Sequence, residues 1–137
     1  MEIEVHDLVP NSLEGTVQIE LEYPVNIPFE IKRVYYIFNT QSIYPRGFHA
    51  QKDSLQMLIC LKGSCELRLD DGKEKSSYNL NRINQGVFID KLIWHEMHEF
   101  TEDCLLMVLS NDYYNEEDNI RNYKDFLEIS KSPQKAV

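Results

Sequence analysis

The segment RGFHAQK, residues 46–52, carries the side chains of this chain that are best suited to chemistry. His49 and Gln51 stand two residues apart, and side chains at that spacing in a β-strand point to the same face. An imidazole exchanges protons near neutral pH, whereas an amide has no titratable proton in that range. Arg46 and Lys52 flank the pair, and cations beside an imidazole favour an anionic ligand. We therefore interpret His49 as a functional residue of a ligand site and not as an isolated strand histidine.

The same histidine begins a longer pattern with the spacing found in cupins. The positions in step with that pattern are His49, Gln51, Gln56, Gly63, Gly86 and His95. Cupins that bind a metal fill the ligand positions with histidine and glutamate, but two of the four are glutamine here. A neutral amide oxygen is a much weaker ligand for a first-row divalent metal than an imidazole or a carboxylate. We therefore expect no metal at this site, which disfavours a metal-dependent cupin oxygenase.

The composition excludes several classes of partner. The 137 residues carry 14 basic and 23 acidic side chains, a formal net charge of −9 at pH 7. Such a chain repels polyanions, which argues against binding to long nucleic acids or to an anionic membrane. A small phosphorylated ligand is compatible with this charge, because it needs only a local cluster of arginines. At this length we expect one domain, residues 1–137, with a core that needs no disulfide.

The distribution of apolar residues bears on the location of the protein. The first residues, MEIEVHDLVP, lack the basic and apolar regions of a secretion signal, and no apolar run approaches the roughly 18 residues of a membrane span. We therefore expect a cytoplasmic protein. Cys60, Cys65 and Cys104 lie in apolar runs without CxxC spacing, so we expect them to be reduced residues of the core.

Short apolar segments separated by Pro, Gly, Asn and Asp predict a chain built mainly of β-strands. The predicted strands are 15–23, 31–38, 46–52, 55–61, 65–70, 86–89 and 104–110. Asp70-Asp71-Gly72-Lys73 predicts a tight hairpin, because Asp-Gly provides the positive φ angles of such a turn. Many short strands without a long linker favour an all-β fold, a cupin or jelly-roll antiparallel β-barrel or a sandwich.

Only the end of the chain departs from this pattern. Ile120, Tyr123, Phe126 and Leu127 recur at helical spacing, and acidic residues come early, as they do at a helix start. The spacing predicts a short C-terminal helix over about residues 112–129. A polar, frayed tail is expected over residues 130–137.

Arginines within the predicted strands are candidates for binding phosphate. Arg33 and Tyr35 share a strand face by parity, and Arg46 stands beside the histidine. Each guanidinium offers paired donors to phosphate oxygens, so we predict that Arg33 and Arg46 bind a pyrophosphate. The alternative for each arginine is a surface ion pair with one of the many acids.

Five segments together resemble the nucleotide-sugar 3,4-ketoisomerases, a cupin family that acts on dTDP-4-keto-6-deoxyglucose. They are IPFEIKRVYYIF (27–38), PRGFHAQK (45–52), LKGSCEL (61–67), WHEMHEF (94–100) and VLSNDYYNEEDNIRNYKDF (108–126). The resemblance covers nearly the whole chain, from about residue 26 to about residue 128, with the segments in the family's order.

The resemblance implies a homodimer that exchanges N-terminal strands and uses neither a metal nor an organic cofactor. It implies a reaction that moves the ketone of the hexose from C4 to C3. A proton leaves C3, an enediol forms, and a proton returns at C4. The product would feed an aminotransferase and give 3-amino-3,6-dideoxyhexoses for surface glycans such as lipopolysaccharide.

The resemblance also assigns residues to the site. The family motif RGxHAHK is matched at Arg46, Gly47, His49, Ala50 and Lys52. Gln51 departs from it, and the family's early arginine-glycine pair is Glu14-Gly15 here. Trp94 and His95 are implied to line the sugar site, and Arg121 to close over the nucleotide.

Each of these added residues has a structural alternative. A strand aromatic such as Trp94 is more often a core residue than a ligand contact. Arg121 is equally compatible with an ion pair to Glu117, one helical turn earlier.

Gln51 leaves two mechanisms open. If the second histidine of the family is a proton shuttle, Gln51 cannot replace it unless Tyr35, Tyr36 or His95 does so. If that histidine is a hydrogen-bond donor, Gln51 keeps the donor, and His49 alone can carry the proton between adjacent carbons on one face.

The first hypothesis for the function is therefore an isomerase with His49 as base, assisted by Gln51 and Tyr35. The second is a nucleotide-sugar-binding cupin without turnover, and a 3,5-epimerase is disfavoured because it needs a base that also reaches C5.

Overall fold

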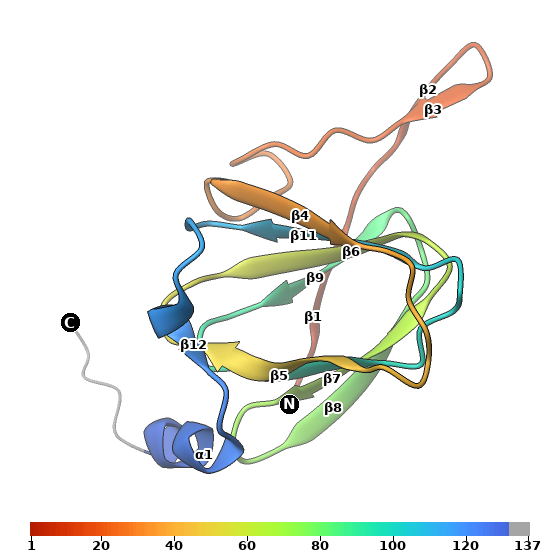
Figure 1. Ribbon diagram of the computed structural model, residues 1–137. Helices are drawn as coiled ribbons and strands as arrows, with labels where there is room; N and C mark the ends of the chain where they lie inside the picture. Colours follow the sequence, from red (N-terminus) through yellow and green to blue (C-terminus); the bar gives the residue numbers. More distant parts are fainter. Residues whose placement is uncertain (132–137) are drawn as a thin grey trace.

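Two facing β-sheets make up most of the computed structural model, which describes residues 1–131 (Figure 1). The first sheet has the strand order β1-β9-β6-β11-β4, and the second has the order β12-β5-β10-β7-β8. Neighbouring strands are antiparallel throughout. The prediction of an all-β cupin or jelly-roll fold is confirmed. Along the described residues no hydrogen-bonded ladder closes the two sheets into one barrel, so the fold is a jelly-roll sandwich.

The bounds of the elements follow from the hydrogen-bond ladders. The strands are β1 (Glu4–Asp7), β2 (Asn11–Leu13), β3 (Thr16–Gln18), β4 (Arg33–Ile37), β5 (Arg46–Gln51), β6 (Gln56–Lys62), β7 (Cys65–Asp70), β8 (Lys75–Leu80), β9 (Gln85–Ile89), β10 (Trp94–His98), β11 (Leu105–Ser110) and β12 (Asn119–Ile120). The helices are the 3₁₀-helix η1 (Glu116–Asp118) and the α-helix α1 (Tyr123–Lys131).

The main core lies between the two sheets, and a second apolar layer covers the outside of the first sheet. Leu58 and Cys60 of β6 belong to the core, whereas Met57 and Ile59 belong to the second layer. Residues 19–31 supply the other side of that layer. Because both faces of β6 are buried, its central residues 57–61 are all apolar and show no alternation.

The predicted strand over residues 15–23 is wrong in its length. Only Thr16–Gln18 is a strand, and it pairs with β2 in a hairpin that projects from the sheets (Figure 1). We call this hairpin, residues 11–18, the arm. Beyond it Ile19 and Leu21 pack against the second apolar layer, so their alternation reflects burial and not a ladder.

The predicted helix over residues 112–129 is also wrong in its bounds. The α-helix covers only Tyr123–Lys131, and the residues before it form a loop, η1 and the short strand β12. Tertiary contacts override helical propensity here. Asn119 and Ile120 pair with β5, and Oδ1 of Asp118 accepts a hydrogen bond from the backbone N–H of Asp53 at 2.9 Å. Ser130 and Lys131, predicted as tail, belong to α1, and residues 132–137 of that tail lie outside the described residues.

Smaller predictions fare better. β7 and β8 form the predicted hairpin, with Gly72 at a φ of 94° in the connection. Cys60, Cys65 and Cys104 are free and buried, as expected. Five strands, β1, β2, β8, β10 and β12, were not among the predicted strands, because they are short or their polar residues dilute the apolar signal.

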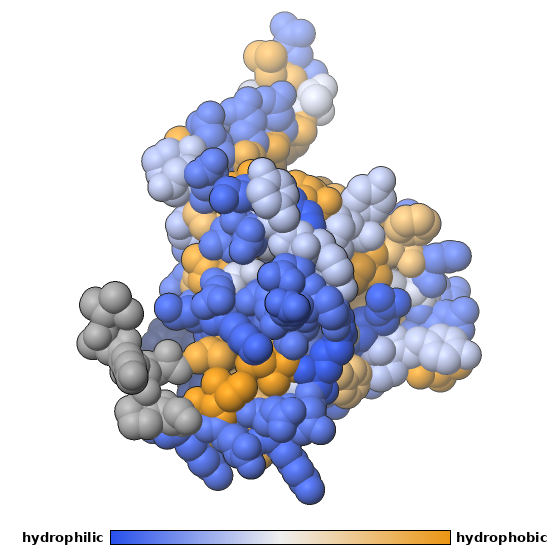
Figure 2. Space-filling view, turned by 60° about the vertical axis from the view of Figure 1, so that its left-hand side comes forward, coloured by the Kyte–Doolittle hydropathy of each residue, from blue (hydrophilic) through white to orange (hydrophobic). Residues whose placement is uncertain are grey.

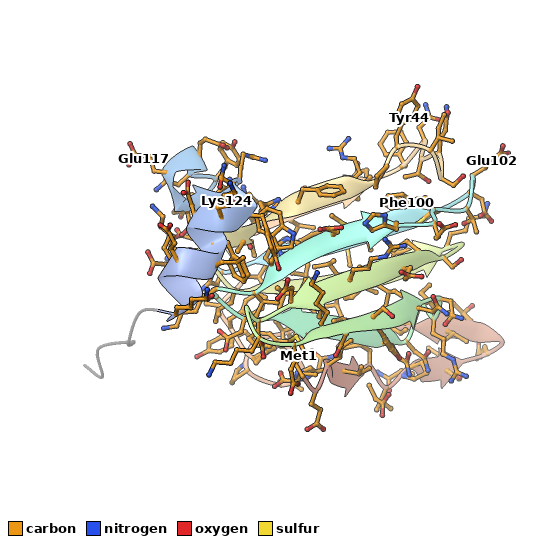
Figure 3. The ribbon with its side chains drawn as sticks, turned by 90° about the horizontal axis from the view of Figure 1, so that it is seen from below. Met1, Tyr44, Phe100, Glu102, Glu117 and Lys124 are labelled. Atoms are coloured by element: carbon orange, nitrogen blue, oxygen red, sulfur yellow. The ribbon has the colours of Figure 1, made fainter. Side chains whose placement is uncertain are left out.

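The C-terminal segment, residues 112–131, sits at one end of the sandwich. Figure 3 shows Glu117 and Lys124 at the end opposite Glu102 and Tyr44. Among residues 1–131 there is no helix with the length and apolar character needed to span a bilayer.

β5 contains one more residue than the stretch of β10 that it faces. His49 pairs with His95 and Gly47 pairs with Glu96, so Phe48 has no partner in the ladder. Gly47 and Phe48 both have positive φ angles, 93° and 62°. These features define a β-bulge, an insertion that re-aims side chains and is frequent beside functional sites.

The bulge changes which side chains of β5 point into the sandwich. Strict alternation would put Arg46 and His49, three residues apart, on opposite faces. Arg46 instead pairs with Met97, and His49 pairs with His95. Opposed residues in an antiparallel pair share a face, and both Met97 and His95 are buried inside the sandwich. Arg46 and His49 therefore point to the same side.

We expect Gly47→Ala to destabilise the bulge. A Cβ at Gly47 would lie 2.8 Å from the carbonyl oxygen of His95, and its φ of 93° already strains any other residue. The free energy of unfolding should fall by about 2–4 kcal/mol, measured by urea denaturation. Gly15→Ala is the matched control, because Gly15 has a φ of 80° but no atom within 4 Å of a Cβ. It should lose only about 1 kcal/mol. Equal losses in the two variants would contradict crowding at the bulge.

Candidate functional site

A cavity of about 510 Å³ is bounded by β4, β5 and the C-terminal segment. Its lining residues are Arg33, Tyr35, Pro45, Arg46, Gly47, Phe48, His49, Gln51, Gln56, Tyr114, Asn119 and Arg121. The cavity thus gathers all three residues predicted as catalytic and three of those predicted to bind the substrate. The sequence does not predict that the cavity residues of β4 lie near those of β5, because the two strands belong to different sheets.

The lining of the cavity is positively charged although the chain is acidic. Arg33, Arg46 and Arg121 line it, and no aspartate or glutamate does. The net charge of the whole chain is −9. Concentrating guanidinium groups in a recess focuses a positive potential there and attracts anions.

Arg33 is held by aromatic rings and not by a carboxylate. Its guanidinium carbon lies 5.3 Å from the centre of the Tyr35 ring and 5.4 Å from that of Tyr114. Its Nε is buried and makes no hydrogen bond within residues 1–131. Neither Arg33 nor Arg46 forms an ion pair in that range, so the alternative of surface salt bridges is wrong for both.

His49 and His95 face one another across β5 and β10. Their ring centroids are 4.5 Å apart, with an edge-to-face angle of 66°. Burial lowers the pKa of His49, and nearby Arg121 lowers it further while Gly47 and Glu116 oppose the shift. Burial and the neighbouring His49 lower the pKa of His95 to about 3. Both imidazoles are therefore neutral at pH 7, which leaves His49 ready to accept a proton.

His95 supports His49 and does not line the cavity itself. Its side chain is only 2% exposed, and its Nδ1 lies 3.2 Å from the carbonyl oxygen of Ile93. With a pKa of about 3, His95 is a poor acceptor of protons at neutral pH. A proton relay through His95 is therefore disfavoured.

The two neighbouring tyrosines of β4 have different environments. Tyr35 lines the cavity, and burial raises its pKa, so its hydroxyl stays protonated and serves as a hydrogen-bond donor. Tyr36 is 63% exposed on the opposite face of the strand. Of the two tyrosines, only Tyr35 can therefore assist chemistry at His49.

The cupin metal positions do not suit a metal ion in this chain. The donors there are the imidazoles of His49 and His95 and the amides of Gln51 and Gln56. Within residues 1–131 no three His, Cys, Asp or Glu side chains converge as ligands. Amide oxygens carry no charge to offset a divalent ion, so this donor set fits a metal poorly.

Arg121 reaches the cavity but is engaged by Glu116. Its Nη2 donates to Oε2 of Glu116 at 2.9 Å. Hydrogen bonds from Arg121 and from Tyr114 lower the pKa of Glu116 to about 2. The predicted alternative partner, Glu117, is wrong, because residues 119–121 are not helical and the four-residue spacing has no meaning there.

Two predicted binding residues, Lys52 and Trp94, lie away from this cavity. Lys52 is exposed, and its backbone amide donates to the carbonyl of Asp118 at 2.9 Å. Trp94 is buried on the outer face of the second sheet, where its ring lies 5.2 Å from Tyr123 and 5.7 Å from Phe126. Neither residue lines the cavity, so their role in binding stays a prediction.

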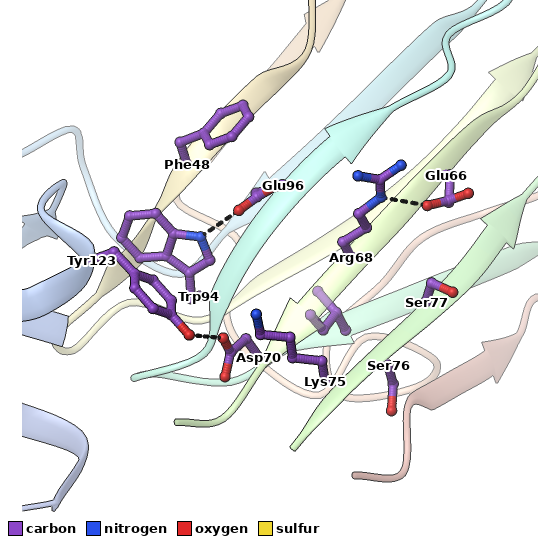
Figure 4. Close-up of a pocket in the computed structure, with 11 residues that line it drawn as sticks. Phe48, Glu66, Arg68, Asp70, Lys75, Ser76, Ser77, Trp94, Glu96 and Tyr123 are labelled. Carbon is purple, nitrogen blue, oxygen red and sulfur yellow. Dashed lines mark hydrogen bonds and ion pairs between the residues drawn. The ribbon is translucent and has the colours of Figure 1, made fainter. Parts of the chain in front are cut away.

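Trp94 belongs instead to a separate groove of about 640 Å³ (Figure 4). Two pairs of polar groups in that groove satisfy one another: Trp94 donates to Glu96 at 2.8 Å, and Tyr123 donates to Asp70.

The sequence analysis missed Tyr114 and Asn119 as cavity residues. Both fall in the segment 108–126 that carries the family resemblance, but helical spacing dominated its interpretation. Gln56 was noticed only as an unsuitable metal ligand. It is 2% exposed and lines the cavity.

The fold and the cavity together define a cupin-type jelly-roll protein with a positively charged small-molecule site. The sequence model of the family described as "FdtA: WxcM-like, C-terminal" matches residues 1–131, and the chain belongs to this family. The family resemblance inferred from the sequence is confirmed.

Known relatives carry consistent descriptions. TDP-4-oxo-6-deoxy-α-D-glucose-3,4-oxoisomerase of Aneurinibacillus thermoaerophilus is 50% identical over 108 residues, 79% of this chain and 78% of the relative. The structure of WlaRA, a TDP-fucose-3,4-ketoisomerase from Campylobacter jejuni, matches with a TM-score of 0.92 and 39% identity over 96% of this chain and 97% of that one. A mutant of the 3,4-ketoisomerase QdtA from Thermoanaerobacterium thermosaccharolyticum, in complex with TDP-4-keto-6-deoxyglucose, matches with a TM-score of 0.90 and 37% identity over 94% of both chains.

We expect buried His95 to make the protein less stable in acid. The unfolded chain binds a proton at this histidine below about pH 6.5, but the folded chain does so only near pH 3. Stability is therefore fully present above pH 6.5 and falls as the pH drops toward 3. We compare the decrease in unfolding free energy from pH 7 to pH 5, measured by urea denaturation. This decrease should be about 2 kcal/mol smaller in His95→Gln than in the parent protein. His6→Gln, a partly exposed histidine of β1, is the control. An unchanged acid dependence in His95→Gln would contradict the expectation.

Proposed function

We propose that this protein moves the ketone of dTDP-4-keto-6-deoxyglucose from C4 to C3 through an enediol. The observation that carries the proposal is the neutral imidazole of His49 beside three arginines, in a cavity lined by no carboxylate. A nucleotide sugar needs both features, a cationic site for its diphosphate and a base beside the sugar. The oxoisomerase that is 50% identical supports the choice of substrate. The C3 ketone suits a later transamination, and we propose that the product supplies amino sugars of surface glycans.

The cavity residues divide the work of the reaction. His49 removes the proton from C3 and leaves an enediolate, in which the hydroxyl proton passes from O3 to the neighbouring O4. The same imidazolium then returns a proton to C4 on the same face of the sugar, so the ketone stands at C3. A general base typically contributes about 10²–10⁴-fold to the rate. Tyr35, kept protonated by burial, donates to the oxygen on which negative charge develops. Arg33 and Arg46 bind the diphosphate, since neither has a carboxylate partner.

A binding protein without turnover is the alternative function. Gln51 cannot exchange protons, so a mechanism that needs two titratable groups would stall in this chain. The residues that line the cavity offer no second base, since Tyr35 has a raised pKa. His95, which does not line it, has a pKa of about 3. Turnover therefore depends on His49 serving both carbons.

We expect proton NMR in D₂O to show a 3-keto sugar when the protein is incubated with dTDP-4-keto-6-deoxyglucose. His49→Gln should lower kcat by about 10²–10⁴-fold, because the amide keeps the polarity but loses the base. His6→Gln makes the same exchange outside the cavity and should leave kcat unchanged. If the parent protein binds dTDP in a titration while the sugar signals stay unchanged, the isomerase proposal fails and the binding function stands.

We also propose a homodimer in which the two arms are exchanged. β4 is an edge strand of the first sheet, and its outer face exposes Val34 and Tyr36 by 52% and 63%. Phe38, directly after the strand, is 63% exposed. The arm projects from the sheets and exposes Leu13 and Val17 by 75% and 62%. Figure 2 shows apolar atoms among the polar ones on this projection, at the top of the view. An exposed apolar arm and an unpaired sheet edge are complementary surfaces for a second copy of the chain.

We expect the protein to sediment with twice its chain mass of 16.2 kDa. Tyr36→Lys places a charge in the proposed interface and should shift the equilibrium toward monomer by at least tenfold, measured by sedimentation equilibrium. Val5→Lys lies on β1, at the opposite edge of the same sheet, and should remain dimeric. A monomeric parent protein, or a Tyr36→Lys variant that dimerises normally, would refute the arm exchange.

A cytoplasmic location is part of the proposal. All three cysteines are free and buried, which suits a reducing compartment.

A further inference from the structure

Four side chains form a continuous polar chain from the surface to the cavity. Arg121 donates to the Glu116 carboxylate from Nε at 2.5 Å and from Nη2 at 2.9 Å. Nδ2 of Asn119 donates to Oε2 of Glu116 at 3.2 Å. Nε2 of Gln51 then donates to Oδ1 of Asn119 at 3.3 Å. The polar chain therefore runs through Arg121, Glu116, Asn119 and Gln51 and ends at the cavity wall.

The carboxylate at the start of this polar chain sets the orientation of both amides. An ionised carboxylate only accepts hydrogen bonds, so the NH₂ group of Asn119 must face Glu116. The oxygen of Asn119 then faces Gln51, and the NH₂ group of Gln51 must face Asn119. Glu116 stays ionised at neutral pH because Arg121 and Tyr114 both donate to it. Each link therefore removes the freedom of the next amide to rotate by 180°.

The last atom of the polar chain is an acceptor without a partner. Gln51 is 4% exposed and lines the cavity. Its Oε1 is buried and makes no hydrogen bond of normal geometry within residues 1–131. A buried acceptor left unpaired is costly, so this oxygen is suited to a donor that the ligand supplies.

We propose that Glu116 and Asn119 are positioning residues that hold the Gln51 carbonyl oxygen as an acceptor for the C3 hydroxyl of the sugar. The inference rests on the proposed function. His49 and Gln51 share a face of β5, about 7 Å apart along the strand. At this separation His49 can remove the proton bound to C3 while Gln51 accepts a hydrogen bond from the hydroxyl on C3. Gln51 accepts the hydrogen bond without taking the proton, so it orients the reacting carbon toward His49.

The orientation of Gln51 adds an acceptor to the hydrogen-bond donor expected from the sequence. The polar chain commits one N–H of its amide to Asn119 and leaves the oxygen as the buried unpaired atom. The site should therefore recognise a hydroxyl hydrogen at C3 and discriminate against sugars without it.

Two unreactive ligands test this inference by calorimetric titration. One is dTDP-6-deoxyglucose, which lacks the C4 ketone and so does not isomerise, and the other is its 3-deoxy analogue. The parent protein should bind the first about 5- to 100-fold more tightly than the second. In Asn119→Ala the amide of Gln51 is free to rotate, and the ratio should fall to about two or less. Gln51→Leu should abolish the preference as well.

The ratio of affinities separates positioning from a general loss of structure. A variant that only loosened the C-terminal segment would weaken both ligands equally and leave the ratio unchanged. Asn115→Ala is the matched control, because Asn115 caps η1 through the amide of Glu117 but does not belong to the polar chain. It should keep the ratio of the parent protein. Equal affinities in the parent protein, or an unchanged ratio in Asn119→Ala, would overturn the inference. Failure of both ligands to bind would instead refute the proposed function.

Discussion

The extra residue in β5 is the constraint on which the cavity depends. Without Phe48 in the ladder, Arg46 would point to the outer face of the second sheet, where Trp94 lies. The bulge requires positive φ angles at Gly47 and Phe48, a strained conformation that persists only because pairing on both sides holds it. The close approach of the His95 carbonyl leaves no room for a side chain at Gly47. Local strain is thus the means by which one strand presents a guanidinium and an imidazole to the same cavity.

The electrostatics of the cavity oppose those of the whole chain. Three arginines face a recess that no carboxylate lines, although the net charge is −9. Burial lowers the pKa of His49, and the nearby Arg121 lowers it further. The same recess that concentrates the arginines therefore keeps the imidazole neutral.

The C-terminal segment completes the site because its residues 112–122 do not form an α-helix. Residues 112–122 satisfy their polar groups with β5 and with one another, so Tyr114, Asn119 and Arg121 reach the cavity. Glu116 neutralises Arg121 and anchors the amide of Asn119.

Patterns of residue type predicted much of the fold and part of the site. Alternation and turn residues predicted the strands, the hairpin after β7 and the facing of Arg33 and Tyr35, because side-chain direction in a strand depends on parity alone. The spacing of His49, Gln51 and Gln56 indicated a cupin without a suitable metal site. Lys52, Trp94 and His95 do not line the cavity, so their predicted roles in binding stay predictions.

The features that the sequence did not predict depend on contacts between residues distant in the sequence. The bulge at Phe48, the end of the strand at Gln18 and the unwound segment before α1 each depend on partners that no local pattern reveals. The neutrality of His95 follows from burial, which is a property of the packed sandwich. The amino-acid sequence alone therefore indicated which side chains are able to perform the chemistry. Tertiary structure decided which of them meet, because strand register, burial and the orientation of an amide exist only between packed elements.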